Sequence, residues 1–133
     1  MIYLDTAALV KLVRRESASD ELVDWLNEQV DRLLVSSSLV EVELPRALRR
    51  SEPSLLAAVP GILARVSVYD VDETVRTTAA AYQDPLIRSL DAIHLATADA
   101  VLGDDLTAFV TYDPRLLATA ESIGLPTASP GSN

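Results

Sequence analysis

The first five residues, Met1-Ile2-Tyr3-Leu4-Asp5, are a short apolar run that ends at an aspartate. A second run, Ala108-Phe109-Val110-Thr111-Tyr112, is followed by Asp113 in the same way. Short apolar runs bounded by polar residues predict buried β-strands. In an open parallel α/β sheet, functional groups gather outside the carboxyl ends of the strands. The two runs therefore predict a sheet with two carboxylates at one edge.

The remaining sequence alternates apolar runs with segments of helical periodicity, which indicates a parallel sheet with helices on both faces. We expect strands over residues 2–5, 33–36, 66–69 and 108–112, with an edge strand over 125–128. We expect helices over 7–15, from Ser17 or Ser19 through Val30, and over 39–50, 54–65, 73–82, 89–102 and 114–124. The predicted fold is a single α/β domain over residues 1–128, with a mostly parallel sheet of four to five strands and a frayed tail over 129–133.

Polar residues and prolines mark several of the expected helix ends. Thr6 and Ser89 are the expected N-caps of their helices, and Pro114 fits the first position of the last helix. Pro45 lies later than the first turn of its helix and should weaken or bend that helix. Pro60-Gly61 should interrupt the helical segment over 54–65.

The composition excludes several classes of site. The 133 residues include no cysteine and one histidine, His94. The lack of cysteine removes disulfides, thiolate zinc sites and cysteine nucleophiles, and it suits a reducing cytoplasm. A Ser-His-Asp triad would need His94 as its base. No apolar run approaches the length that spans a bilayer, so we expect a cytoplasmic protein without a membrane partner.

The net charge of −9 argues against a nucleic-acid partner, because phosphate binding normally needs a basic surface. Six of the eleven basic residues nevertheless fall in two stretches, Lys11-Leu12-Val13-Arg14-Arg15 and Arg46-Ala47-Leu48-Arg49-Arg50. Each stretch follows a candidate site acid on its own expected helix, so basic charge would border an acidic centre. Solvated helix ends, where cations complement the helix dipole, are the alternative interpretation.

Four acidic residues are the candidate site: Asp5, Glu43, Asp91 and Asp113. Carboxylates that converge at one edge of a sheet repel one another strongly unless a cation lies among them. Their oxygen atoms suit a hard divalent ion, Mg²⁺ or Mn²⁺. Each acid also has a structural alternative: Asp5 and Asp113 as N-caps, Glu43 as the i+3 partner of Arg46, and Asp91 as a first-turn acid favoured by the helix dipole.

Two neighbours of these acids bear on the assignment. Glu41 fits a capping box with Ser38, which gives Glu41 a structural role and favours Glu43 for the site. His94 shares a helical face with Asp91 and is a further candidate metal ligand, although a lone histidine is more often a packed or hydrogen-bonded residue.

The acids lie in four motifs that occur in order along the chain. They are Met1-Ile2-Tyr3-Leu4-Asp5-Thr6-Ala7-Ala8-Leu9, Ser37-Ser38-Leu39-Val40-Glu41-Val42-Glu43-Leu44-Pro45-Arg46-Ala47, Leu90-Asp91-Ala92-Ile93-His94-Leu95-Ala96 and Phe109-Val110-Thr111-Tyr112-Asp113-Pro114-Arg115-Leu116. Together they resemble PIN-domain ribonucleases, and more specifically the VapC toxins of bacterial toxin–antitoxin pairs. The resemblance spans essentially the whole chain. It implies a Mg²⁺- or Mn²⁺-dependent endoribonuclease that is neutralised by a small cognate VapB-like antitoxin and forms a homodimer or a toxin–antitoxin hetero-oligomer.

The resemblance also implies roles for the four acids, which fall on the family's four acidic positions. We expect Asp5 and Asp91 to be the main metal ligands, Glu43 to orient the metal-bound water or hold a second ion, and Asp113 to complete the charge of the cluster. Ala7 departs from the family, which often carries serine or threonine at this position.

Two other classes of protein would also gather acids at strand ends. A receiver-like phospho-switch needs a lysine at a late strand end, and the only lysine here is Lys11. A catalytically silent domain of the same fold, acting as a protein- or RNA-binding module, is the remaining alternative.

Overall fold

The computed structural model describes residues 1–29 and 32–132. Its centre is a five-stranded sheet in the order β3-β2-β1-β4-β5, in which every neighbouring pair of strands is parallel. The strands are β1 (Ile2–Leu4), β2 (Leu34–Ser37), β3 (Ser67–Tyr69), β4 (Ala108–Val110) and β5 (Thr127–Ala128). The predicted α/β class and edge strand are therefore confirmed, and the sheet is parallel throughout.

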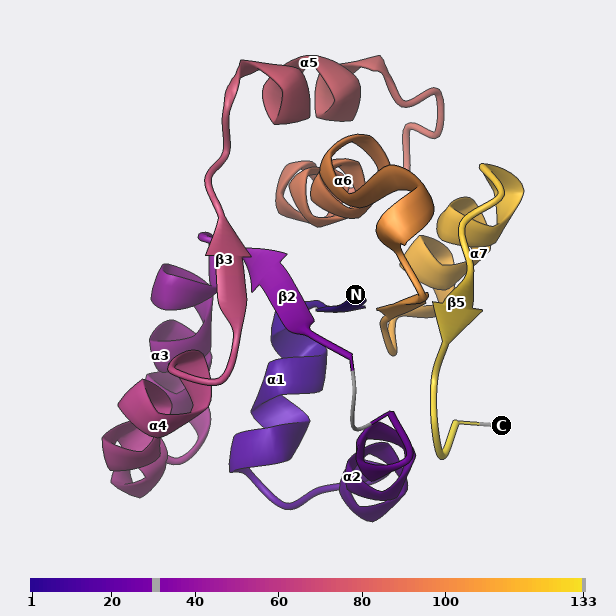
Figure 1. Cartoon of the computed structure of the whole chain (residues 1–133). Helices are drawn as coiled ribbons and strands as arrows, with labels where there is room; N and C mark the ends of the chain where they lie inside the picture. Colours follow the sequence, from indigo (N-terminus) through magenta and orange to yellow (C-terminus); the bar gives the residue numbers. More distant parts are fainter. Residues whose placement is uncertain (30–31, 133) are drawn as a thin grey trace.

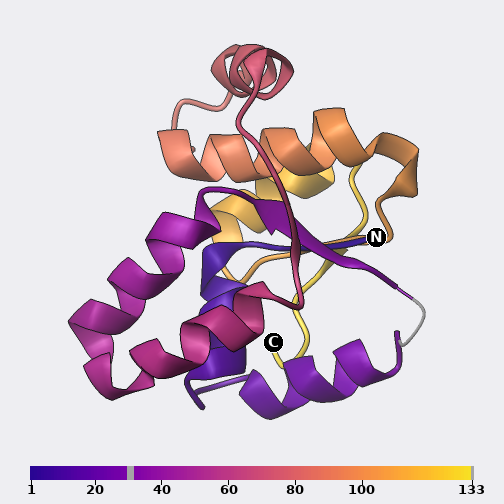
Figure 2. The ribbon, with the colours of Figure 1, turned by 60° about the vertical axis from the view of Figure 1, so that its left-hand side comes forward.

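Helices cover both faces of this sheet (Figure 1). They are α1 (Thr6–Val13), α2 (Ser19–Asn27), α3 (Val40–Ser51), α4 (Val59–Leu63), α5 (Glu73–Ala81), α6 (Ser89–Ala96) and α7 (Pro114–Ser122). The shorter segments are the 3₁₀ turns η1 (Pro53–Ala58) and η3 (Gly103–Asp105) and the π-helical continuation of α6, η2 (Thr97–Leu102). In Figure 2, α6 and α7 lie above the sheet, with α5 outside α6, and α1 to α4 lie below it.

The alternation of side chains along β1 divides the core into two parts. Ile2 and Leu4 belong to the cluster that contains the buried leucines of α1, α2 and α3. Tyr3 belongs to the opposite cluster, formed with β4, α6 and α7, where its ring stacks on Phe109 at a centroid distance of 5.2 Å. Successive residues of a strand face opposite sides of the sheet. Strand β1 is therefore buried on both sides, as its continuous apolar run predicted.

Two of the expected helix caps are wrong. Asp5, not Thr6, is the N-cap of α1, and its Oδ1 accepts a hydrogen bond from the Ala8 N–H. Arg88, not Ser89, precedes α6 and makes no side-chain cap hydrogen bond. Asp5 caps α1 because, from the end of β1, its carboxylate reaches first-turn N–H groups that have no partner within the helix.

The capping box predicted for Ser38 and Glu41 is also absent. The Ser38 N–H donates to the Tyr69 carbonyl at 2.9 Å, and α3 begins after Leu39 without a side-chain cap hydrogen bond. The Ser38 N–H, which Glu41 was expected to reach, is therefore already hydrogen-bonded to β3. Glu41 is exposed.

The two prolines occupy different places in their helices. Pro45 lies inside α3, which runs from Val40 to Ser51 without a break, and the expected bend or weakening stays a prediction. Pro60 lies in the first turn of α4, where a missing N–H costs nothing, so the interruption falls before it, between η1 and α4. The expected helix residue Val30 lies outside the described residues.

The tail is held against the end of β4. The Ser129 hydroxyl donates to the Thr111 carbonyl at 2.6 Å, and the Tyr112 hydroxyl donates to the Pro130 carbonyl at 2.8 Å. Ser129 and Pro130 therefore have hydrogen-bond partners in this structure, the expected fraying stays a prediction, and Asn133 lies outside the described residues. Among the helices in the described part of the chain, none is both long and apolar enough to cross a membrane.

A pair of substitutions in α3 tests how this helix is anchored. Leu44 is 0% exposed, so Leu44→Ala should lower the free energy of unfolding by about 2–5 kcal/mol through lost burial and a residual cavity. Val42 is 64% exposed on the same helix, and Val42→Ala should change it by less than about 0.5 kcal/mol. Urea unfolding of both variants measures the difference, and equal effects would contradict the orientation of α3.

Candidate active site

The candidate site lies where the order of the strands reverses. The chain passes from β1 to β2 and β3 on one side, and it then returns to the other side of β1 for β4 and β5. Ligands of open α/β sheets bind at such a switch point, outside the carboxyl ends of the strands. Asp5 follows β1 directly, and its N–H donates to the carbonyl of Val110, the last residue of β4.

All four predicted acids line one cleft of about 540 Å³ at this place. Asp5 precedes α1, Glu43 and Asp91 lie in the first turns of α3 and α6, and Asp113 precedes α7. Four helices therefore begin around the cleft and each brings one carboxylate. The prediction that these side chains gather is confirmed, and their chemical roles remain predictions.

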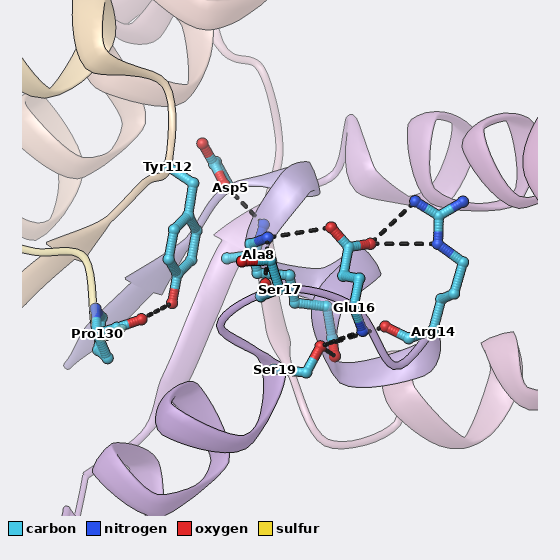
Figure 3. Close-up of polar contacts among 9 residues, drawn as sticks. Asp5, Ala8, Arg14, Glu16, Ser17, Ser19, Tyr112 and Pro130 are labelled. Atoms are coloured by element: carbon cyan, nitrogen blue, oxygen red, sulfur yellow. Dashed lines mark hydrogen bonds and ion pairs between the residues drawn. The ribbon is translucent and has the colours of Figure 1, made fainter. Parts of the chain in front are cut away.

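Asp5 and Asp113 are both helix caps and cleft residues. Asp5 Oδ1 accepts from the Ala8 N–H and Asp113 Oδ1 accepts from the Arg115 N–H, each at 2.9 Å. Figure 3 shows the bond between Asp5 and Ala8 at the start of α1. Each cap uses one carboxylate oxygen, and both side chains still line the cleft. The capping interpretation is correct for both residues, and it does not compete with a place in the site.

Glu43 is held by residues other than Arg46. Its Oε1 accepts from the Thr6 hydroxyl at 2.7 Å and lies 2.7 Å from His94 Nε2. His94 is 2% exposed, and its Nδ1 lies 2.6 Å from the Tyr3 hydroxyl. Both ring nitrogens are thus engaged, which supports the hydrogen-bonded interpretation of His94. Sequence reasoning missed Tyr3 altogether, because an apolar strand gives no signal for one hydroxyl.

The protein environment divides the acids into two groups. Burial raises the pKa of Asp5, and the Thr111 hydroxyl and the Ala8 N–H offset this only in part. Burial also raises the pKa of Asp91, with further contributions from the charges of Asp113 and Glu43. Burial acts in the same direction on Glu43, but hydrogen bonds from His94 and Thr6 outweigh it and lower its pKa.

Three arginines border the acidic cleft: Arg14, Arg50 and Arg88. Arg14 donates through two nitrogens to Glu16 Oε1 (Figure 3). Lys11 pairs with the other oxygen of Glu16. Of the six basic residues in the two stretches singled out in the sequence, two therefore line the cleft, Arg14 and Arg50. Arg88, which precedes α6, was not predicted.

The donor set fits a hard divalent cation by its chemistry, because it consists of carboxylate oxygens. Within residues 1–29 and 32–132, however, no three acidic or histidine side chains are close enough to form a ready-made metal site. Mg²⁺ keeps several of its waters and needs only one or two direct carboxylates. The cleft therefore fits an ion held partly through water, and a closed protein cage is not required.

Comparison with known proteins agrees with this arrangement. A family model for the PIN domain matches residues 2–122. The chain is 52% identical over 132 residues to "Ribonuclease VapC35" of Mycobacterium tuberculosis, with 98% of each chain covered. It is 41% identical over 135 residues to "Ribonuclease VapC47" of the same species, covering 99% of this chain and 98% of the relative. The chain therefore belongs to the PIN-domain family and, within it, to the VapC group.

A solved structure shows the same fold. It is described as the crystal structure of VapBC2 from Rickettsia felis bound to a DNA fragment from their promoter. The TM-score is 0.73 at 17% identity, with 97% of this chain and 98% of that chain covered. The α/β architecture predicted from the strand and helix pattern is thus also found in that solved structure.

Asp91→Asn should stabilise the metal-free protein at neutral pH. Folding raises the pKa of Asp91, so this carboxyl binds more protons in the folded state than in the unfolded state. The free energy of unfolding therefore falls as the pH rises above the pKa of an aspartate in the unfolded chain, about 3.9. The asparagine removes this loss, and thermal unfolding in EDTA should show a midpoint higher by a few degrees. The gain should vanish at about pH 3, where the Asp91 carboxyl is protonated in both the folded and the unfolded protein.

Asp104→Asn is the matched control, because Asp104 is an exposed acid outside the cleft. It should leave the midpoint unchanged at both pH values. A lower midpoint for Asp91→Asn at neutral pH would contradict the conclusion that burial and neighbouring charges disfavour the ionised form of Asp91.

Proposed function

We propose that this protein is a metal-dependent endoribonuclease that hydrolyses RNA phosphodiester bonds. As the toxin of a toxin–antitoxin pair, it would inhibit translation or growth when free of its antitoxin. The observation that carries the proposal is the gathering of Asp5, Glu43, Asp91 and Asp113 from four helix starts in one cleft at the switch point of the sheet. The VapC ribonucleases that resemble the chain over 98–99% of its length support the reaction class.

Asp5 and Asp91 would hold Mg²⁺ or Mn²⁺, directly or through water. When bound, the ion supplies a nucleophilic water at neutral pH and neutralises the charge that develops on the phosphoryl group. Burial raises the pKa values of Asp5 and Asp91, and the charges of nearby carboxylates add to this rise, so a cation between them would favour their ionised forms. Asp113 adds a further negative charge beside Asp91.

Glu43 has a different role from the two ligands. Hydrogen bonds from His94 and Thr6 lower its pKa, so it stays ionised at neutral pH. An ionised carboxylate of low basicity is a weak general base, but it accepts hydrogen bonds well. Glu43 would therefore orient the attacking water by accepting a hydrogen bond from it.

The arginines at the edge of the cleft would place the RNA backbone. Arg50 and Arg88 are exposed and line the cleft, whereas the charge of Arg14 is shared with Glu16. Phosphate contacts of this kind fix register without reading sequence. They also explain how a chain of net charge −9 would approach a polyanion, since positive charge is concentrated beside the site.

A VapB-like antitoxin would be the natural protein partner. The solved structure of similar fold is described as a VapBC pair, which supports a partner of this type. We propose that the antitoxin docks beside α1, α3 and α4 and places an arginine or lysine among the four carboxylates, where a charge-assisted hydrogen bond replaces the metal. The homodimer or toxin–antitoxin hetero-oligomer expected from the family remains a prediction.

Asp5→Asn tests the metal site. Asparagine keeps the shape and can still cap α1, but it removes a ligand charge, so RNA cleavage in Mg²⁺ or Mn²⁺ should fall by at least about 100-fold. Calorimetric titration should show weaker binding of Mn²⁺ by the variant, and EDTA should abolish cleavage by the wild type.

Glu41→Gln is the control for this experiment, because Glu41 is exposed on α3 and does not line the cleft. It should cleave RNA at the wild-type rate. Wild-type protein that binds the ion without cleaving any RNA would favour the catalytically silent alternative, and cleavage that is indifferent to EDTA would exclude the metal mechanism.

Antitoxin binding should close the cleft. The complex purified after co-expression should be inactive on RNA, and proteolysis of the antitoxin should restore cleavage. Replacing the inserted basic residue of the antitoxin by alanine should weaken inhibition while leaving most of the apolar interface in place. A complex that cleaves RNA at the rate of the free protein would contradict this arrangement.

A further inference from the structure

Four side chains at the cleft form one connected hydrogen-bond network, and each comes from a different element. Tyr3 belongs to β1, Thr6 to α1, Glu43 to α3 and His94 to α6. The Tyr3 hydroxyl lies 2.6 Å from His94 Nδ1, and His94 Nε2 lies 2.7 Å from Glu43 Oε1. The Thr6 hydroxyl donates to the same Oε1 at 2.7 Å and lies 3.3 Å from Nε2.

The chemistry of these groups gives the network a direction. An ionised carboxylate can only accept hydrogen bonds, so His94 Nε2 must carry the proton that faces Glu43. In a neutral imidazole Nδ1 is then the acceptor, and it must receive the Tyr3 hydroxyl proton. Donors therefore run from Tyr3 through His94 to Glu43, and Thr6 adds a second donor at the same oxygen.

Both donors converge on Oε1 of Glu43. Oε2 has no hydrogen-bond partner among the described residues, and Glu43 itself lines the cleft. His94 and Tyr3 are 2% and 0% exposed, so the part of the network behind Glu43 is shielded from water. Within the described part of the chain, every buried side-chain nitrogen or oxygen has a partner. A fully satisfied buried network holds its members in one arrangement.

We propose that Tyr3, His94 and Thr6 are positioning residues that fix the Glu43 carboxylate by Oε1 and present Oε2 to the cleft. None of the three needs to touch RNA or metal for this role. The proposal rests on the proposed function, because Oε2 would accept the hydrogen bond of the attacking water. It gives the lone histidine a role other than metal ligation, and it assigns a role to a tyrosine hydroxyl inside the core.

The protonation of His94 provides a readout that is independent of activity. His94 is the only histidine, so its imidazole ¹⁵N signals are unambiguous in labelled protein. Without metal, the wild-type imidazole should carry a proton on Nε2. Tyr3→Phe, which removes the donor to Nδ1, should shift the signals toward a mixture of tautomers. A wild-type imidazole without a proton on Nε2 would overturn the network, because Nε2 could not then donate to Glu43.

Steady-state RNA cleavage tests whether the network positions Glu43. Thr6→Val replaces the hydroxyl by a methyl group of the same size, and it should lower kcat by about 10-fold with little change in KM. Thr6→Ser restores the hydroxyl and should recover the wild-type kcat. Tyr3→Phe should lower kcat to a similar extent.

Tyr69→Phe is the matched control, because the only hydrogen bond of the Tyr69 hydroxyl among the described residues is to the Met1 sulfur, and Tyr69 does not line the cleft. It should cleave RNA at the wild-type rate. Wild-type kcat for Thr6→Val, or equal loss in Thr6→Val and Thr6→Ser, would overturn the positioning role. If the wild-type protein cleaves no RNA, the proposed function is wrong. The imidazole signals would still decide whether the network exists.

Discussion

The structure depends on how β1 ends. Ile2, Tyr3 and Leu4 are fully buried between two layers of helices, and the next residue is a carboxylate that is itself 5% exposed. A buried charge is costly unless it is hydrogen-bonded or paired. The Ala8 N–H at the start of α1 supplies a hydrogen bond, which also fixes where that helix begins. The geometry at Asp5 therefore links the central strand, the first helix and the floor of the cleft.

The remaining acids add repulsion that the metal-free fold only partly relieves. Glu43 is stabilised in its ionised form by His94 and Thr6, while Asp5 and Asp91 are held in surroundings that favour their neutral forms. A fold selected only for stability would not keep this arrangement, since removing one charge should stabilise it. Sites that conflict with stability in this way are expected where function requires the conflict.

The basic residues show the same division between structure and function. Glu16 binds both Lys11 and Arg14, and this pairing fixes the turn between α1 and α2. Arg50 and Arg88 form no ion pair with another described residue and border the cleft. A chain with a strongly negative net charge can thus present a small positive surface next to its acids. Net charge alone would have argued against the proposed RNA substrate.

Local sequence determined the strands, the parallel α/β class and the gathering of the four acids, because apolar runs and strand-end positions are local features that a parallel sheet brings to one edge. It did not determine the partners of those acids. Glu43 meets Thr6 and His94, which are 37 and 51 residues away in the chain, and not its helical neighbour Arg46. The capping box at Ser38 likewise lost its amide to Tyr69 on β3. Spacing along a helix predicts only contacts within that helix. The contacts of Glu43 and Ser38 join different elements, so they exist only once the helices have packed on the sheet.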